Sequence, residues 1–126
     1  MLRVVPEDTS EEQLEDQEIS FRVAGEATVV DLPPIVRRAV AEKLGSILAF
    51  ILRSRPPQLL LDFTRVRRIE SSGIAACLYA HRESSDIATR LGIIGIAPAV
   101  MRLFTIARID VFFEFYEDEE QALAKA

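Results

Sequence analysis

The segment from Asp62 to Gly73 (Asp-Phe-Thr-Arg-Val-Arg-Arg-Ile-Glu-Ser-Ser-Gly) holds the densest group of side chains that could do chemistry. Two neighbouring hydroxyls, Ser71 and Ser72, follow three arginines and open a stretch with helical spacing. Serines at a helix N-terminus lie where free backbone N–H groups and the helix dipole stabilise negative charge. A phosphate on such a serine is therefore electrostatically favoured, and nearby arginines can assist it. The alternative is that the serines only cap the helix, since serine is a preferred capping residue.

Cys77 and His81 are further candidates, because they stand four residues apart on one face of the expected helix. That spacing suits metal ligands, but no third or fourth ligand stands nearby, and a buried free cysteine behaves as a small apolar residue. Ser71 and His81 make a poor catalytic pair, because ten helical residues separate them by about 15 Å. We therefore expect no enzyme, no metal site and no cofactor.

Strands and helices are expected to alternate along the chain and to place these side chains at one edge of a sheet. Alternating apolar residues predict a strand at 19–24, and a short apolar run predicts a buried strand at 59–61. Asp31, as a cap, and Pro33-Pro34, in a first turn, predict a helix that ends near Arg53. Further elements are expected as a helix at 71–85, a strand at 91–96, a helix from Pro98, a strand at 111–115 and a helix at 117–124.

This order predicts one α/β domain over residues 19–126, with a mostly parallel sheet of four to five strands and about four helices. Residues 1–18 are expected to form a short strand, Leu2 to Val5, followed by a solvated acidic loop. Residues 1–5 are thus a candidate edge strand of the sheet. In open α/β sheets, sites lie beyond the carboxyl ends of the strands, which is where residues 64–72 fall.

Composition narrows the class of protein. The chain has 126 residues, of which 49% are hydrophobic and 28% charged, so it can bury one core and is not expected to be disordered overall. No run of 18 apolar residues is present, which predicts no membrane span. Acidic residues stand where a secretory signal would need an apolar stretch, and one cysteine allows no internal disulfide. We therefore expect a cytoplasmic protein.

The net charge of −5 is unevenly distributed. Residues 1–18 carry −6 and residues 114–126 carry −4, whereas residues 19–113 carry +5. Nearly all bases of this middle region are arginines. Its basic excess is weak for a nucleic-acid binder, and we expect no nucleic-acid partner.

The segment from Asp62 to Ile74 resembles the signature of STAS domains, the sulfate-transporter and anti-sigma-factor-antagonist family. Asp62-Phe63-Thr64-x-Val66-x-x-Ile69-Glu70-Ser71-Ser72-Gly73-Ile74 is similar to the family's usual Asp-hydrophobic-Ser/Thr-x-Val-x-x-hydrophobic-Asp-Ser-Ser/Thr-Gly-Leu. Val23-x-Gly25-Glu26 resembles its first core strand and Gly-Glu turn, and Gly95-Ile96-Ala97-Pro98-x-Val100 resembles the entry to its third helix. Ile109-Asp110-x-Phe112, followed by an acidic helix start, resembles its C-terminal end. The resemblance spans about residues 19–124.

The resemblance implies a regulatory protein that acts by docking. In bacterial anti-sigma factor antagonists, a partner serine kinase, itself the anti-sigma factor, phosphorylates the first serine of the motif. A metal-dependent, PP2C-type phosphatase removes the phosphate. Carried over by motif, the phosphoacceptor is Ser71. The expected partner-binding surface comprises this serine and its neighbours, Arg65, Arg67, Arg68, Glu70, Ser72, Gly73 and Ile74.

One position departs from the family pattern, because Glu70 stands where aspartate is usual. Glu70 either still positions Ser71 or marks a chain that has lost efficient phosphorylation. The alternative function is therefore a STAS scaffold or adaptor subunit, without the switch, in a stress-signalling or lipid-transport complex. A small hydrolase or transferase is a third hypothesis, for which no catalytic constellation is visible. A homodimer is left open.

Overall fold

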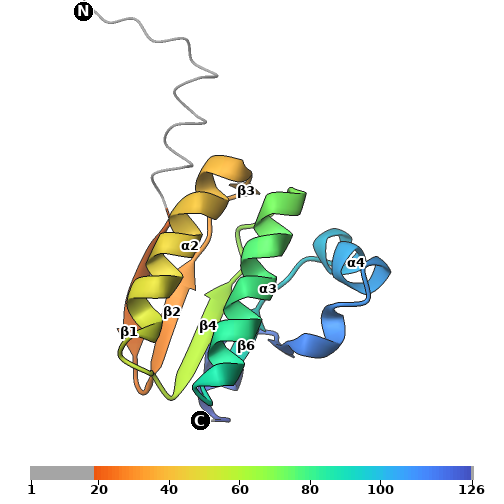
Figure 1. The fold of residues 1–126 in the computed structure, drawn as a ribbon. Coiled ribbons are helices and arrows are strands. Elements are labelled where there is room, and N and C mark those ends of the chain that lie inside the picture. Colours follow the sequence, from red (N-terminus) through yellow and green to blue (C-terminus); the bar gives the residue numbers. More distant parts are fainter. Residues whose placement is uncertain (1–18, 126) are drawn as a thin grey trace, which may run out of the picture.

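A computed structural model describes residues 19–125, which form a five-stranded sheet, a small two-stranded sheet and helices packed against the main sheet (Figure 1). The expected strand and acidic loop within residues 1–18 lie outside the described residues. In chain order the elements are β1 (Ser20–Ala24), β2 (Ala27–Asp31), β3 (Ile35–Val36), α2 (Arg38–Leu52), β4 (Gln58–Asp62), β5 (Arg68–Ile69), α3 (Ser71–Asp86), β6 (Arg90–Ile94), α4 (Pro98–Ile106), a 3-10 helix (Asp110–Phe112), β7 (Glu114–Tyr116) and α5 (Glu119–Leu123).

The main sheet has the order β1-β2-β4-β6-β7, and all its pairs are parallel except β1 with β2. The expected α/β class, the mostly parallel sheet and the four helices are confirmed. A second sheet has only two short parallel strands, β3 and β5. The arrowheads of β2 and β4 in Figure 1 point toward β3 and the start of α3, so the segment 64–72 does follow a carboxyl strand end.

The N-terminal third of the domain differs from the sequence prediction. Gly25 and Glu26 form a tight turn that folds β2 back on β1, and Gly25 supplies a positive φ of 62°. Residues 27–31, expected to lead into a helix, are a central strand because β2 pairs with both β1 and β4. The Gly-Glu pair is therefore a turn, as expected, but it leads into a second strand and not toward a helix.

The helix predicted from Asp31 begins later, and two smaller boundaries also shift. The Pro33-Pro34 pair precedes β3, and α2 starts at Arg38. Near the C-terminus, the expected strand at 111–115 begins as a 3-10 helix, and β7 starts at Glu114. The expected strand at 91–96 ends at Ile94, and the final helix is confined to Glu119–Leu123.

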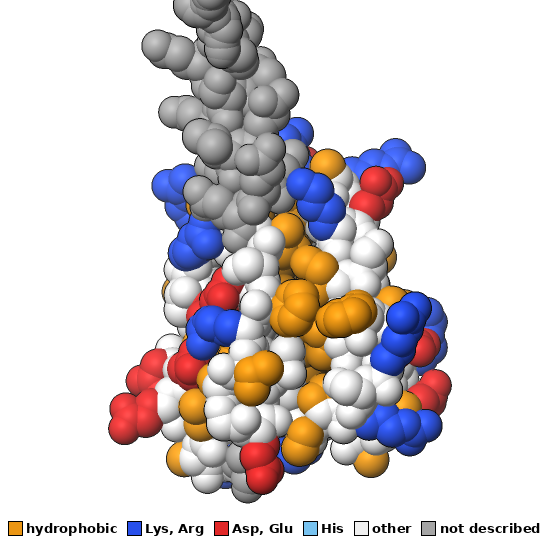
Figure 2. Space-filling model, turned by 90° about the vertical axis from the view of Figure 1, so that its left-hand side faces the viewer, with side chains coloured by type: hydrophobic (Ala, Val, Ile, Leu, Met, Phe, Trp, Pro, Cys, Tyr) orange, Lys and Arg blue, Asp and Glu red, His pale blue; other side chains and the backbone are white. Residues whose placement is uncertain are grey.

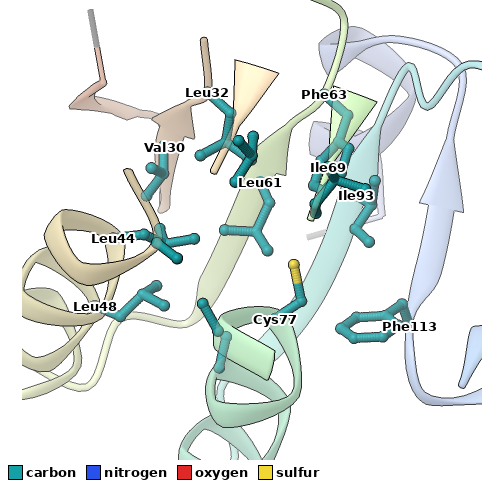
Figure 3. Close-up of a cluster of buried hydrophobic side chains, with 14 of the residues drawn as sticks. Val30, Leu32, Leu44, Leu48, Leu61, Phe63, Ile69, Cys77, Ile93 and Phe113 are labelled. Carbon is teal, nitrogen blue, oxygen red and sulfur yellow. The ribbon is translucent and has the colours of Figure 1, made fainter. Parts of the chain in front are cut away.

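The main core lies between the sheet and the helices α2 and α3 (Figure 3). Leu44 and Leu48 of α2 and Cys77 of α3 point toward the strands and are fully buried. A smaller cluster on the opposite sheet face includes Leu60 and, from α5, Ala122. Within residues 19–125, no helix is long and apolar enough to cross a membrane.

Candidate functional site

The start of the loop after β4 is held in place by hydrogen bonds. The backbone N–H and Oγ1 of Thr64 both donate to Asp62 Oδ1, at 2.9 and 2.6 Å. The N–H of Phe63 donates to the Ile94 carbonyl at 2.8 Å, which ties the loop to the end of β6. Val66 and Ile69 are buried at 2% and 6% exposure. The loop therefore has a fixed course.

The small β3–β5 sheet then fixes where α3 begins. The N–H groups of Arg67 and Arg68 donate to the Pro34 carbonyl at 2.8 and 3.2 Å. The N–H of Glu70 donates to the Val36 carbonyl at 2.9 Å. Ordinary backbone pairing thus positions the residues just before the two serines. The sequence prediction missed this pairing, because strands of two residues carry no periodicity.

The two serines at the start of α3 have different surroundings. Glu70 occupies the N-cap position but makes no capping bond with its side chain, and Ser71 is the first helical residue. Ser71 is exposed, whereas the Ser72 hydroxyl is buried and has no hydrogen-bond partner in the described chain. Neither serine is the cap of α3, so simple capping does not account for them.

Gly73 lets α3 approach the small sheet closely. A Cβ at this position would lie 2.6 Å from Ile69 Cγ1 and 2.7 Å from Val36 Cγ1. These distances are too short for carbon atoms in contact, so a side chain would push the helix start outward. The next residue, Ile74, is half-buried and packs against the main core. Ser71 is therefore exposed on a tightly seated helix end.

Arginines surround the helix end on two sides. Arg65, Arg67 and Arg68 are exposed on the β4–α3 loop, as expected. The structure adds Arg37 and Arg38, which line a shallow hollow of about 380 Å³ together with Glu70. The sequence predicts a helix over both residues, whereas α2 begins only at Arg38. Parallel pairing of Ile35 with Arg68 brings them to the site. The resulting rim, residues 37–38 and 65–72, is rich in positive charge around Ser71.

An open groove of about 630 Å³ runs between α2 and α3 from this rim. Its walls are mostly small or apolar side chains, and its polar lining residues include Arg38, Glu42 and Ser72. The residues that supply the small side chains are Ala41, Gly45, Ala49, Ala75 and Ala76. Such a surface can receive a side chain from a docking protein but offers no acid–base pair for catalysis.

Cys77 and His81 do not form a second site. Burial raises the pKa of the Cys77 thiol to about 12. The His81 ring stacks on Phe112 with centroids 4.7 Å apart. Across the part of the chain that the structure describes, no group of three His, Cys, Asp or Glu side chains is placed to hold a metal ion. The pair belongs to the packing of α3.

Comparisons with solved structures agree on the fold. An anti-sigma factor antagonist from Mycobacterium paratuberculosis is 20% identical, with a TM-score of 0.76 over 85% of this chain and 91% of that one. The phosphorylated form of the Bacillus cell fate determinant SpoIIAA is 19% identical, with a TM-score of 0.69 over 85% and 97% of the two chains. A sulfate transporter family protein from Wolinella succinogenes is 17% identical, with a TM-score of 0.73 over 82% and 87%.

Sequence comparison identifies the family. No curated protein sequence matches the chain. A family model described as "Mlab, STAS domain" matches residues 19–114, which contain the whole rim around Ser71 and all but the last two elements of the fold. The chain therefore belongs to the STAS domain family.

Proposed function

We propose that this protein is a regulatory binding module that docks a partner through the rim around Ser71 and is switched by phosphorylation of that serine. The observation that carries the proposal is the contrast between the neighbouring serines: Ser71 is exposed and Ser72 has a buried hydroxyl. Ser71 is thus accessible to a kinase without unfolding of α3. The motif assigns the phosphate to the same serine.

The proposed partner is an anti-sigma factor that is also a serine kinase, opposed by a PP2C-type phosphatase. Support comes from the family resemblance and from similar structures named as an anti-sigma factor antagonist and as a phosphorylated form of SpoIIAA. The positive charge of the rim also supports the proposal, because arginine side chains attract phosphate groups. The groove between α2 and α3 continues the rim and extends the surface that the partner would cover.

The switch follows from the electrostatics of a phosphate at a protein interface. The phosphate adds about −1.5 to −2 charges at neutral pH. At the N-terminus of the 16-residue helix α3, this charge is tolerated by the helix dipole. In the complex the same charge must be desolvated against the partner surface, which opposes binding. A hundredfold loss of affinity requires only about 2.7 kcal/mol.

The test is phosphopeptide mapping of the protein from its own cells and after incubation with candidate kinases and ATP. We expect one phosphate on Ser71, none in Ser71→Ala, and an unchanged level in the matched control Ser72→Ala. Ser71→Asp should weaken kinase binding by roughly a hundredfold, in line with the estimate above. Absence of phosphate under growth and stress, together with no transfer from candidate kinases, would reject the switch.

A second candidate function, a constitutive STAS adaptor subunit, is favoured by Glu70. A glutamate beside the acceptor keeps a fixed carboxylate at the docking surface, one methylene farther out than the family's aspartate. The similarity to a sulfate transporter family protein is compatible with an adaptor. Glu70→Asp separates the two functions: faster phosphorylation of Ser71 supports the switch, whereas a stable complex indifferent to residues 70 and 71 supports the adaptor.

A further inference from the structure

One edge of the main sheet is open within the described chain. β1 is an outer strand and pairs only with β2. Its closing pair, Ala24 with Ala27, flanks a two-residue turn, so the hydrogen-bonded pairs are those of residues 24, 22 and 20. The N–H and C=O groups of Phe21 and Val23 therefore point away from β2. An edge of this kind is a template for another strand.

An apolar surface lies beside the same edge. The side chains of Phe21, Val23 and Phe50 are 42%, 75% and 60% exposed, although all three are large and apolar. The two Phe rings lie 6.0 Å apart, so β1 and α2 share one patch. Figure 2 shows hydrophobic side chains gathered in the middle of this face. A groove of about 370 Å³, lined in part by these three residues, runs between β1 and the end of α2.

We propose that the first five residues of the chain occupy this edge as a sixth, antiparallel strand. Leu2 and Val4 alternate with Arg3, so a strand there would place both apolar side chains on one face. Laid on the patch, they would cover Phe21 and Val23. Arg3 would then face the opposite side, where Asp31 and Glu119 carry negative charge around Arg22.

The connecting residues, 6–18, are long enough to bring the first five residues back beside β1. Residues 6–18 join the proposed strand to β1 through the end of β1 that pairs with Asp31. Thirteen residues exceed what is needed to turn back to a position about 4.8 Å away. They also carry seven carboxylates and lead into Ile19 and β1, whose first residue pairs with Asp31 at the carboxyl end of β2, the same end of the sheet as the arginine-rich rim. Opposite charges thus favour the same path.

Effective concentration favours residues 1–5 of the same chain over a strand from a second copy of the protein. A strand tethered by a short flexible linker has an effective concentration in the millimolar range, whereas a second molecule must bind from solution. The family match starts at residue 19, so the proposed strand is an addition to the matched domain. The proposal does not depend on phosphorylation of Ser71.

The test is amide hydrogen exchange, followed by NMR, on the full-length protein. Phe21 and Val23 have outward N–H groups, and Arg22 and Ala24 are internal controls bonded to β2. We expect at least tenfold protection at Phe21 and Val23, with NOEs from the Leu2 and Val4 methyls to the Phe21 and Phe50 rings. The double variant Leu2→Asp/Val4→Asp should abolish both, while Arg22 and Ala24 stay protected and report an intact domain.

A matched control adds the same charge elsewhere. Thr9→Asp/Ser10→Asp places two carboxylates in the connecting residues and should leave the protection of Phe21 and Val23 unchanged. Unprotected amides in the full-length protein would overturn the proposal. Protection that rises with protein concentration and survives Leu2→Asp/Val4→Asp would also overturn it, because a second copy would then cover the edge.

Discussion

Polar side chains at the amino ends of the parallel strands and those of the rim around Ser71 differ in how they are bonded. At the amino ends, Arg90 donates to Glu114 at 3.0 Å and to the Lys125 carbonyl, and Tyr116 donates to Glu114. At the carboxyl ends, within residues 19–125, the side chains of Arg67, Arg68, Glu70 and Ser71 make no hydrogen bond or ion pair. The amino-end charges hold the C-terminal segment, whereas these four rim side chains are unpaired within the described residues.

The backbone under the rim is held in place by hydrogen bonds, although the rim side chains are exposed. The carboxyl-end rim has exposed side chains on a closely packed frame, because the N–H groups of residues 67, 68 and 70 are all bonded to the β3 segment. Exposed side chains on a backbone held by hydrogen bonds suit a docking surface, because the main chain loses little conformational entropy on binding. Substitutions in the close-packed start of α3, in the amino-end network and at an exposed rim arginine test this difference in turn.

The largest loss of unfolding free energy is expected from Gly73→Ala, which disrupts the close packing of α3 against the small β3–β5 sheet. The new Cβ would stand 2.6 Å from Ile69 and 2.7 Å from Val36, and such overpacking costs about 1–3 kcal/mol of unfolding free energy. Chemical denaturation measures the loss. Thiol labelling of buried Cys77 gives a local readout, because opening of α3 exposes it.

Gly45→Ala in α2 is the matched control for Gly73→Ala. Nothing lies within 4 Å of a Cβ at residue 45, so the helix should gain about 0.5–1 kcal/mol from the alanine. Equal effects of the two substitutions on the unfolding free energy would contradict the close approach at Gly73.

The next effect concerns the amino-end network at alkaline pH. Burial raises the pKa of Tyr116 to about 12, and its bond to Glu114 acts in the same direction. Because this folded value lies above the unfolded value near 10, the stabilisation is complete below pH 10 and is lost as the pH rises toward 12. We expect a loss on the order of 1–2 kcal/mol over that interval, which Tyr116→Phe should remove.

Absorbance titration checks the same group directly. In a Tyr79→Phe background, Tyr116 is the remaining tyrosine, and its ionisation should have a midpoint near 12 in the folded protein. A midpoint near 10 would show that Tyr116 is neither buried nor bonded to Glu114 as described.

The sequence predicted the long elements and the motif loop but not the N-terminal hairpin. The buried strand β4 and the helix α3 carry strong local signals, and their predicted bounds, 59–61 and 71–85, agree with the structure to within one residue at each end. Pro33-Pro34 was misleading because a proline pair also suits a loop before a helix, and β2 competes for residues 27–31 through pairing on both sides. Such pairing involves distant residues, so local pattern cannot reveal it.

The candidate site was predicted in part for the same reason. Ser71, Ser72 and the arginines of the loop are contiguous in the chain, and the motif brings them together without knowledge of the fold. Arg37 and Arg38 reach the rim only through β3, and the exposure of Ser71 against the buried hydroxyl of Ser72 depends on how α3 is seated. The sequence therefore indicates the residues of the loop, and packing distinguishes exposed Ser71 from the buried hydroxyl of Ser72.

The smallest stability effect, and the sharpest form of the comparison, comes from neutralising one arginine at each end. Arg90→Gln removes the bonds to Glu114 and the Lys125 carbonyl, but the Arg90 side chain is 40% exposed, so the loss should not exceed about 1 kcal/mol. Arg68→Gln removes an exposed side chain without a partner in the described chain and should change stability by less than about 0.5 kcal/mol. Under the proposed function, affinity for the partner reverses this order: Arg68→Gln weakens binding and Arg90→Gln does not. Denaturation and binding are measured on both variants at low and high salt. Charges that are bonded within the fold are not available to a partner. A single arginine that governed both the unfolding free energy and the affinity for the partner would therefore contradict the difference between the two ends.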